Sequence, residues 1–430
     1  MKKPTILKFA LFALIFFQSI VSHSQNFKDF EPRYNNKNLR GDILLIGNSI
    51  LNRDTRDRWG NGDGPNVPYD KKGQNGNFTM NYINVDGGAG IFNSSSATLT
   101  LPNPTCSKIV YVGLYWSAVT RGADPIDKVK FKMPGGSYID IEGTVIYDAK
   151  NNKVGSSLPY VSYANVTDYF TKATPIPNPT GSYSVANVST AEGSNKDNGL
   201  NTGLSAGWSL FFVYENATLP EKAITSFDGF SAIDKNNNLD IKVSGFTTIP
   251  VGRVKAKFAF SAIEGDADIQ GDFLAINGVK SIPAERPLEL GDPGWIWNGQ
   301  KWVWGRESKD NFFNSSVTSL GTVLNNRTPN SANTLGFDAG VYEIDNPPTT
   351  AYPGGSIIKN GDTSAVISLG SNQDVYFYYF NAFAVEIIAP RIVLVKKVFG
   401  KDENGNDYDA GNKDIGIDKD LRYEIGFQNK

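Results

Sequence analysis

Alternation of apolar and polar side chains with a period of two residues is the feature that most constrains how this chain folds. In segment 128–133 three apolar residues alternate with three lysines, and in 139–142 two isoleucines alternate with two acidic residues. In 254–260, Val, Ala and Phe residues alternate with Lys255, Lys257 and Ala259. Because successive side chains of a strand point to opposite faces, these segments predict strands with one solvated face.

Three longer runs are apolar at every position and predict central strands. They cover residues 109–116, 208–214 and 375–380, and such runs are typical of strands that are covered on both faces. Helical periodicity is almost absent, with one short helix expected near 166–171. We therefore predict an all-β fold, an antiparallel, jelly-roll-like β-sandwich that forms either one body or two lobes.

The amino terminus has the pattern of a secretory signal peptide. Two lysines precede an apolar run from Ile6 to Val21, and small residues follow at Ser22 and Ser24. The run is too short, and too interrupted by Gln18 and Ser19, to span a bilayer. We expect cleavage after residue 24, export from the cytoplasm to the cell surface or medium, and no transmembrane segment in the mature chain.

Removal of residues 1–24 also removes the only histidine, His23, and three lysines, which leaves 39 basic and 44 acidic residues and a net charge of −5. This acidic balance argues against a nucleic-acid partner. Without imidazole there can be no Ser-His-Asp triad and no histidine-ligated zinc site. The single cysteine, Cys106, excludes an intramolecular disulfide, and we expect it to be a small buried residue.

The composition of successive segments predicts four regions. The signal peptide covers 1–24, and the polar, Asn-rich stretch 25–40 is expected to be a flexible lead-in. Residues 41–389 would form the β-sandwich head, with the lobe boundary, if there are two lobes, near 216–221. A new strand is expected after Pro390, at the start of region 390–430.

Several ordered motifs in the head resemble a family of surface proteins. They are Gly113-Leu114-Tyr115-Trp116, the segment 207–215, Phe227-Asp228-Gly229-Phe230, and Glu264-Gly265-Asp266 followed by Gly271-Asp272 and Asn277-Gly278. This set is similar to the amino-terminal domain of large bacterial adhesins with tandem immunoglobulin-like repeats, of the gliding-motility and type IX secretion kind found in Bacteroidetes. The segment 392–427 resembles the first half of one such repeat. The resemblance implies a cell-surface location and further repeats in the same polypeptide, and it brings no catalytic residues.

Four of the seven tryptophans fall within ten residues and predict an aromatic hairpin: Trp295, Trp297, Trp302 and Trp304. A two-residue turn at Asn298-Gly299 or at Gly299-Gln300 would join the two strands. Both registers place the four indoles on one face. They would either pack onto a sheet or form an exposed platform for sugar rings or another partner.

Acidic side chains cluster in the segment that follows the predicted strand 254–260: Glu264, Asp266, Asp268 and Asp272. Carboxylates at alternate positions of an extended segment can clasp a hard cation such as Ca²⁺. The alternative is that they are turn residues that accept hydrogen bonds from backbone amides. Two further Asp/Asn-rich loops, 234–238 and 402–409, lack the EF-hand glycine and glutamate, and we expect ordinary hairpin loops there or a calcium-stiffened junction near 402–409.

Three functional hypotheses follow from the sequence. The first is a non-catalytic, secreted adhesin head that binds a glycan or a surface protein. The second is a structural stalk or lattice subunit. The third is a glycoside hydrolase, which needs only two carboxylates, with Glu264 and one of Asp266, Asp268 or Asp228 as candidates.

Overall fold

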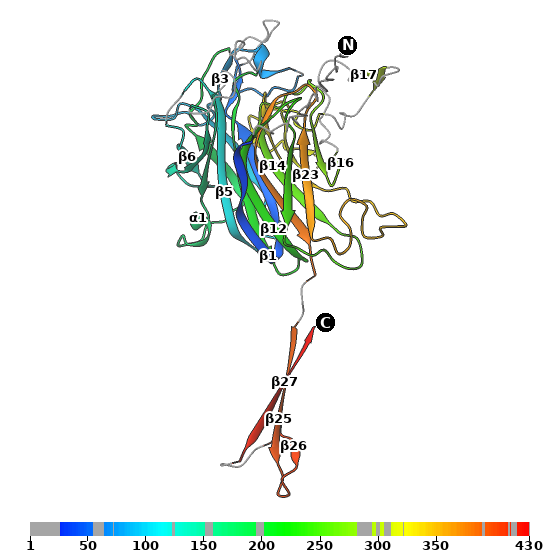
Figure 1. Ribbon diagram of the computed structural model, residues 1–430. Helices are drawn as coiled ribbons and strands as arrows, with labels where there is room; N and C mark the ends of the chain where they lie inside the picture. The colour runs from blue at the N-terminus through cyan, green and yellow to red at the C-terminus, as the bar shows by residue number, and fades with distance from the viewer. Residues whose placement is uncertain are drawn as a thin grey trace, which may run out of the picture.

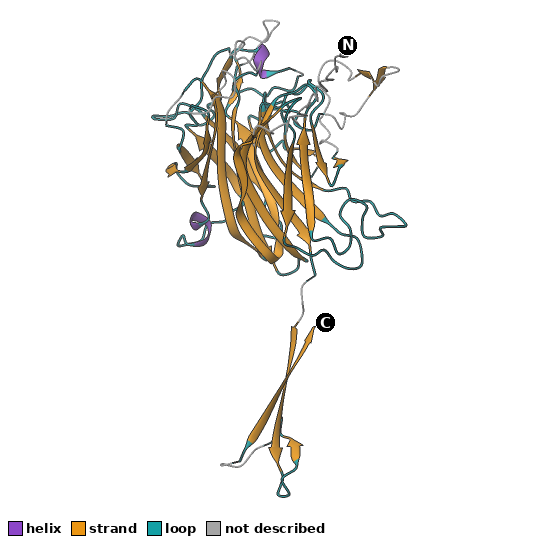
Figure 2. Cartoon of the chain, in the orientation of Figure 1, coloured by secondary structure: helices purple, strands orange, loops and turns teal. Residues whose placement is uncertain are grey.

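The structure is a computed structural model that describes residues 26–54, 64–71, 73–122, 125–150, 158–194, 202–281, 295–297, 302–304, 311–320, 322–388, 392–411, 413 and 419–429. The described residues form an almost entirely β protein, as predicted. They contain a single short α-helix, α1 (Asp168–Thr171), and one 3₁₀ turn, η1 (Asn75–Asn77), which are both purple in Figure 2. No helix among these residues is long and apolar enough to cross a membrane.

The largest sheet has eleven strands in the order β20-β19-β22-β14-β24-β12-β1-β11-β5-β9-β8. The strands on one side of β1 are β11 (Ala206–Asn216), β5 (Ser107–Thr120), β9 (Leu158–Asn165) and β8 (Thr144–Asp148). Those on the other side are β12 (Glu221–Ile233), β24 (Tyr376–Glu386), β14 (Ala256–Ile263), β22 (Phe337–Glu343), β19 (Val317–Ser319) and β20 (Thr322–Val323).

Strand β1 (Asn26–Ser49) folds back on itself and divides this sheet into two halves. Its first leg, 26–40, pairs with β12, and its second leg, 41–49, pairs with β11. The reversal falls at Gly41, where a Cβ atom would lie 2.0 Å from the carbonyl oxygen of Tyr214. A glycine is therefore required at this position.

The two halves pack face to face, and we call them inner sheet I (second leg of β1, β11, β5, β9, β8) and inner sheet II (first leg, β12, β24, β14, β22, β19, β20). The rings of Phe211 and Phe380, one from each half, lie 5.1 Å apart between centroids. The hydroxyl groups of Ser209 and Ser261 are 2.9 Å apart across the same interface. On its other face, each inner sheet is covered by a further, outer sheet. The head is therefore a stack of β-sheets (Figure 1).

Outer sheet I covers inner sheet I and consists of β21 (Arg327–Thr328), β4 (Ser94–Leu99), β10 (Gly181–Ala186), β6 (Lys128–Lys132) and β7 (Ile139–Glu142). Outer sheet II covers inner sheet II and consists of β13 (Leu239–Ser244), β23 (Ser364–Gly370), β15 (Phe273–Ile276) and β16 (Val279–Lys280). Trp208 Nε1 donates to Ser95 Oγ at 2.9 Å between the first pair of layers. Buried residues of β13, β15 and β23 form one apolar cluster with those of β14 and β24 between the second pair.

The strands predicted from apolar runs and from alternation are confirmed, at β5, β11, β24, β6, β7 and β14, as is the helix near 166–171. Val129 and Phe131 of β6 are buried while Lys128 is exposed. The alternation in 254–260 was expected to mark a strand with one solvated face, and this expectation is wrong. Strand β14 is covered on both faces, because Phe258 and Phe260 face outer sheet II while Ala259 faces inner sheet I.

The expectation of a flexible lead-in at 25–40 is wrong for the described residues 26–40, which form the first leg of β1. This leg pairs through its backbone, so its polar side chains remain exposed and give no apolar pattern. Four register shifts against β12 also disturb its alternation. Its aromatic residues still anchor it, because the Phe27 and Tyr34 rings lie 5.6 and 4.7 Å from Tyr147 and Tyr111.

The boundary expected near 216–221 is only the turn between β11 and β12, where the Leu219 amide donates to Asn216 O at 3.0 Å. One buried apolar cluster contains residues from both sides of this turn, such as Phe211 and Phe380. The chain therefore does not divide there into separately packed lobes.

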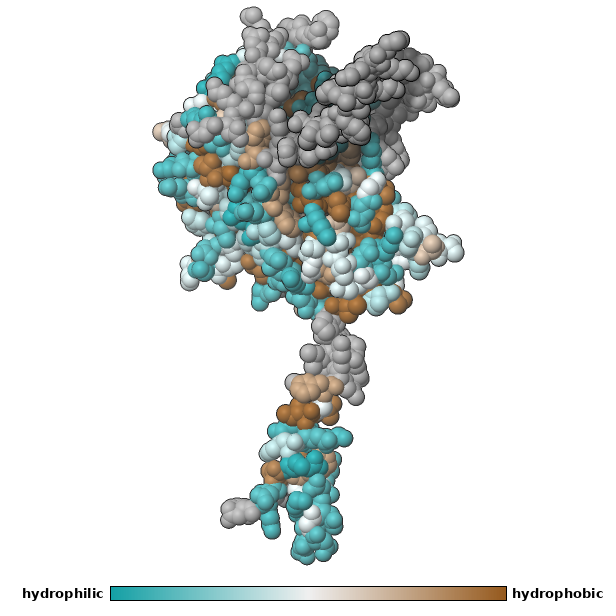
Figure 3. Space-filling model, viewed as in Figure 1, coloured by the Kyte–Doolittle hydropathy of each residue, from teal (hydrophilic) through white to brown (hydrophobic). Residues whose placement is uncertain are grey.

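The carboxy-terminal residues form a separate three-stranded antiparallel sheet of β26 (Asp407–Asp409), β25 (Ile392–Lys401) and β27 (Leu421–Asn429). The strand expected after Pro390 is present as β25, and Pro390 itself lies outside the described residues. Large apolar side chains of β27 are exposed at alternate positions: Leu421, Tyr423, Ile425 and Phe427. In the space-filling view, hydrophobic residues lie at the surface of this small sheet among hydrophilic ones (Figure 3). An immunoglobulin-like repeat remains a prediction for this region.

Two smaller pairs complete the described strands. Strands β2 (Leu51–Arg53) and β3 (Met80–Tyr82) form one pair, close to the 3₁₀ turn η1 (Asn75–Asn77). Strands β17 (Trp295–Trp297) and β18 (Trp302–Trp304) form the other.

Candidate functional site

The connections at one end of the stack converge on the buried carboxylate of Glu264, directly after β14. We call this the loop end and define it by segments 73–78, 202–205, 264–272 and 371–374. Glu264 is 2% exposed and has a backbone φ of 75°. A non-glycine residue with positive φ is uncommon and marks a locally constrained backbone.

Donors from two other segments enclose the Glu264 carboxylate. Asn75 Nδ2 lies 3.1 Å from both of its oxygens, and the Gly203 amide donates to it at 2.9 Å. The Ser205 hydroxyl also donates to it. Burial nevertheless raises the pKa of Glu264 to about 7, since enclosure disfavours the charged form more than these donors favour it. Glu264 thus connects three loops and does not face open solvent.

The carboxylates of Asp272 and Asp374 accept hydrogen bonds from backbone amides. Asp374 Oδ2 accepts a hydrogen bond from the Asp266 amide at 2.9 Å, and Asp272 Oδ1 accepts one from Phe313 at 2.7 Å. Burial raises the pKa of Asp266 and of Asp374 well above the usual range. Asp272 raises both pKa values further, and Glu264 raises that of Asp266. Asp268 is exposed.

The calcium clasp by Glu264, Asp266, Asp268 and Asp272 stays a prediction, which the arrangement of the described side chains does not support. No group of three or more carboxylate, histidine or cysteine side chains there is arranged to hold a metal ion. The segment is not extended as the prediction required, since Glu264 turns away with positive φ and is held by Asn75 and Ser205. The alternative interpretation, turn residues that accept backbone hydrogen bonds, describes Asp272, which accepts from the Phe313 amide.

The loop at 402–409 is an ordinary hairpin connection, as one of the two expectations stated. Asp402 Oδ1 accepts hydrogen bonds from the Asn404 and Asn406 amides at 2.9 and 2.8 Å. Asp407 pairs with Arg422 at 2.7 Å and with Lys401 at 3.4 Å. Its carboxylate therefore already has two cationic partners.

The tryptophan hairpin is rooted at the loop end. It belongs to the connection between β16 and Asn311, and Asn311 pairs with Asp272 in an isolated parallel bridge. The backbone register pairs Trp295 with Trp304 and Trp297 with Trp302, one of the two registers that the sequence allowed. The side chains of this hairpin lie outside the described part of the structure, so the platform remains a prediction.

The fourth carboxylate considered for glycoside hydrolysis, Asp228, lies elsewhere, between the inner sheets. It is 2% exposed, and the Arg33 guanidinium binds both of its oxygens, at 2.6 and 2.8 Å. The Tyr115 hydroxyl donates to it at 3.0 Å. Asp228 therefore holds the first leg of β1 to β12 and β5, and it does not pair with Glu264.

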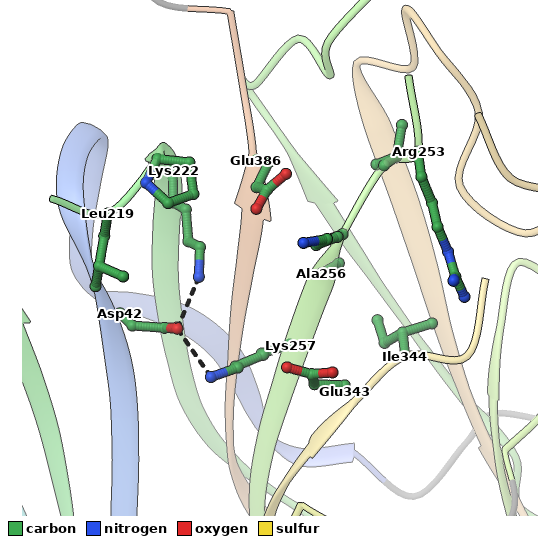
Figure 4. Close-up of a pocket in the computed structure, with 12 residues that line it drawn as sticks. Asp42, Leu219, Lys222, Arg253, Ala256, Lys257, Glu343, Ile344 and Glu386 are labelled. Carbon is green, nitrogen blue, oxygen red and sulfur yellow. Dashed lines mark hydrogen bonds and ion pairs between the residues drawn. The ribbon is translucent and has the colours of Figure 1, made fainter. Parts of the chain in front are cut away.

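A charged pocket that the sequence did not reveal lies at the opposite end, where β24 ends at Glu386 (Figure 4). We call this the tether end, because the chain continues from here to β25. The pocket has a volume of about 320 Å³. It is lined by Asp42, Leu219, Pro220, Lys222, Arg253, Val254, Lys255, Ala256, Lys257, Glu343, Ile344 and Glu386.

The strand register explains why the charged side chains meet in this pocket. Lys222 pairs with Glu386 and Lys257 with Glu343, so each pair points to one face of inner sheet II. Asp42, at the start of the second leg of β1, faces them and accepts from Lys222 at 2.7 Å and from Lys257 at 2.8 Å. The sequence signal was present as Lys255 and Lys257 in an alternating strand, but it predicted a solvated face and not a pocket.

Comparisons with known proteins were made for the whole chain. No family model matches it, and no curated protein matches it. Among solved structures, PNGF-II is similar over 82% of this chain and 66% of its own, with 10% identity and a TM-score of 0.21. PNGase F, a glycosylasparaginase from Flavobacterium meningosepticum, is similar over 81% and 97%, with 11% identity and a TM-score of 0.19. This chain thus spans just under two thirds of the PNGF-II chain, and similarities this low carry no argument about its chemistry.

Proposed function

We propose that this protein is a non-catalytic, secreted cell-surface protein whose head binds a glycan or a surface partner through its loop end. The observation that carries the proposal is that the loop end and the tether end lie at opposite ends of the layered head (Figure 1). Strand β24 runs from Tyr376 near the loop end to Glu386 at the tether end. A head attached in this way presents its connections and the tryptophan hairpin away from its attachment.

The chemistry of the described carboxylates supports binding over catalysis. Glu264 is enclosed by three donor groups, and Asp228 is neutralised by Arg33 between two sheets. Neither can reach a glycosidic bond from those positions, because a catalytic acid or nucleophile must contact its substrate. The mature sequence also contains no histidine to act as a general base.

A glycan array probed with residues 25–430 tests the proposal. We expect binding to a subset of glycans, and we expect a Trp295→Ala/Trp297→Ala variant to lose at least tenfold in affinity, because stacking of a ring on an aromatic face needs the indole. A Tyr352→Ala variant is the matched control, since Tyr352 is an exposed aromatic residue in the 343–364 connection outside the loop end. Binding unchanged in the tryptophan variant would remove the loop-end platform, and absence of glycan and surface-protein binding would remove the proposed function.

A further inference from the structure

The pocket at the tether end is lined by seven charged side chains. Its cationic side chains are Lys222, Arg253, Lys255 and Lys257, and its carboxylates are Asp42, Glu343 and Glu386. Two ammonium groups share a single oxygen of Asp42, and the Asp42 side chain is only 7% exposed. In the strand register Lys222 lies beside Glu386 and Lys257 lies beside Glu343. Arg253 contacts Asp345, outside the pocket, at 3.8 Å. The lining therefore combines cationic donors with carboxylate acceptors.

The lysines concerned are held in place by the fold. The side chain of Lys222 is 8% exposed and that of Lys257 is 17% exposed. Each ammonium group has three N–H donors, and one donor of each is directed to Asp42. Their position at the wall of the pocket leaves further donors for a ligand, in a partly enclosed place where screening by solvent is reduced.

The rest of the lining offers acceptors and an apolar surface. Glu343 and Glu386 can accept hydrogen bonds from hydroxyl groups. Leu219, Pro220 and Ile344 supply carbon surface on the same pocket. A volume near 320 Å³ is at the small end of the range for ligand pockets, about 300–1,000 Å³, so the ligand has one or two rings.

We propose that this pocket binds an acidic sugar of the uronic acid type. The sugar carboxylate would contact Lys255, Lys257 and Lys222, its hydroxyl groups would donate to Glu343 and Glu386, and its C–H face would lie on the apolar wall. A bare inorganic anion would leave the glutamates and the apolar wall unused. A neutral sugar would offer no anionic acceptor to the lysine N–H donors that face the pocket.

This inference rests on the proposed function only in choosing a sugar among carboxylate-bearing ligands, because the pocket and the loop end lie at opposite ends of the head. The two sites can therefore be tested separately. The Trp295→Ala/Trp297→Ala variant should keep its affinity for a uronic acid. Loss of array binding with retention of uronic acid binding would remove the proposed function and leave the pocket.

Calorimetric titration of residues 25–430 with D-glucuronate, D-glucose and acetate tests the ligand class. We expect D-glucuronate to bind at least tenfold more tightly than either of the others, because only it has both the carboxylate and the ring hydroxyls. The affinity should decrease as salt is added. Equal affinity for D-glucose and D-glucuronate, or for acetate and D-glucuronate, would overturn the proposal.

Two variants place the binding in the pocket. Lys255→Ala changes an exposed residue and should weaken D-glucuronate binding at least fivefold. The double variant Asp42→Asn/Lys257→Met removes a charge pair together, so that neither charge is left buried alone, and it should weaken binding further while its thermal melt remains cooperative. Lys242→Ala is the matched control, since Lys242 is an exposed lysine of β13 outside the pocket. Unchanged affinity in Lys255→Ala and in a folded double variant would overturn the assignment.

Discussion

At the scale of single residues, the most informative group is Glu264, a buried carboxylate with three kinds of donor around it. Its position after a strand was visible in the sequence, but its role was not. The donors come from residues 75, 203 and 205, far away in the chain. Sequence spacing cannot report such partners, which explains why a metal clasp was predicted where the structure has a junction between loops.

The raised pKa of Glu264 predicts a specific dependence of stability on pH. Its pKa rises from 4.5 in the unfolded chain to about 7 in the fold, so the native state binds more protons between these two values. Stability from this group is therefore complete below about pH 4.5 and decreases by about 3 kcal/mol as pH rises through 7. Thermal melts of wild type and Glu264→Gln between pH 5 and 8 should show a steeper decrease for the wild type.

Glu142→Gln is the control for this experiment, because Glu142 is an exposed carboxylate. It should leave the pH dependence of the melting temperature as in the wild type. If Glu264→Gln also followed the wild-type curve in parallel, the assignment of the raised pKa to Glu264 would be wrong.

Cys106 provides a second prediction at this scale. It was expected to be buried, but it is exposed, in the turn that precedes β5. No apolar alternation surrounds Cys106 in the sequence, and a lone cysteine is usually buried, so only the structure corrects the expectation. A maleimide reagent should label the native protein at this thiol to completion within minutes. Labelling only after addition of denaturant would contradict the exposed position.

At the scale of elements, the strands with strong side-chain patterns were predictable, and the first leg of β1 was not. Strands β5, β11 and β24 have uninterrupted apolar runs because both of their faces are covered. The first leg of β1 has mostly exposed polar side chains, and its pairing is made by backbone groups that every sequence possesses. A side-chain pattern cannot reveal such an edge segment.

The ion pair between Arg33 and Asp228 is expected to hold this leg in place. Arg33→Ala would leave the buried Asp228 carboxylate without its cation, which for fully buried pairs costs about 3–5 kcal/mol. Because the Arg33 side chain is 34% exposed, we expect a smaller loss, about 2 kcal/mol, in urea unfolding.

Two further variants separate this ion pair from simple loss of a side chain. Arg33→Ala/Asp228→Asn should recover part of the lost stability, since the unpaired charge is removed. Lys28→Ala, which affects an exposed lysine of the same leg with a 3.9 Å contact to Glu31, should change stability by less than about 0.5 kcal/mol. A destabilisation by Lys28→Ala equal to that by Arg33→Ala would contradict the role given to the pair.

At the scale of the whole molecule, the chain passes from inner sheet I to inner sheet II at the turn 216–221, yet both sheets share one apolar cluster. The class of fold followed from alternation, because alternation reports which faces are buried. The order of the layers could not be predicted from alternation, because it depends on which sheets pack against each other. The contact between Phe211 of inner sheet I and Phe380 of inner sheet II is an example. The pocket at the tether end also depends on this order.

The shared cluster predicts that the head folds as one unit. Residues 25–218 and 219–388, produced separately, should each lack a cooperative thermal transition, because each would expose half of a buried interface. Residues 25–388 produced as one chain should melt in a single transition. Two fragments that each melt cooperatively would contradict the shared core.

The central claim is that the head binds its ligand and does not convert it. Its most direct test is titration of residues 25–430 with the glycan that gives the strongest array signal, with the mass of that glycan recorded before and after prolonged incubation. The account predicts saturable binding and an unchanged glycan mass. Release of a sugar or of any other fragment during incubation would contradict it.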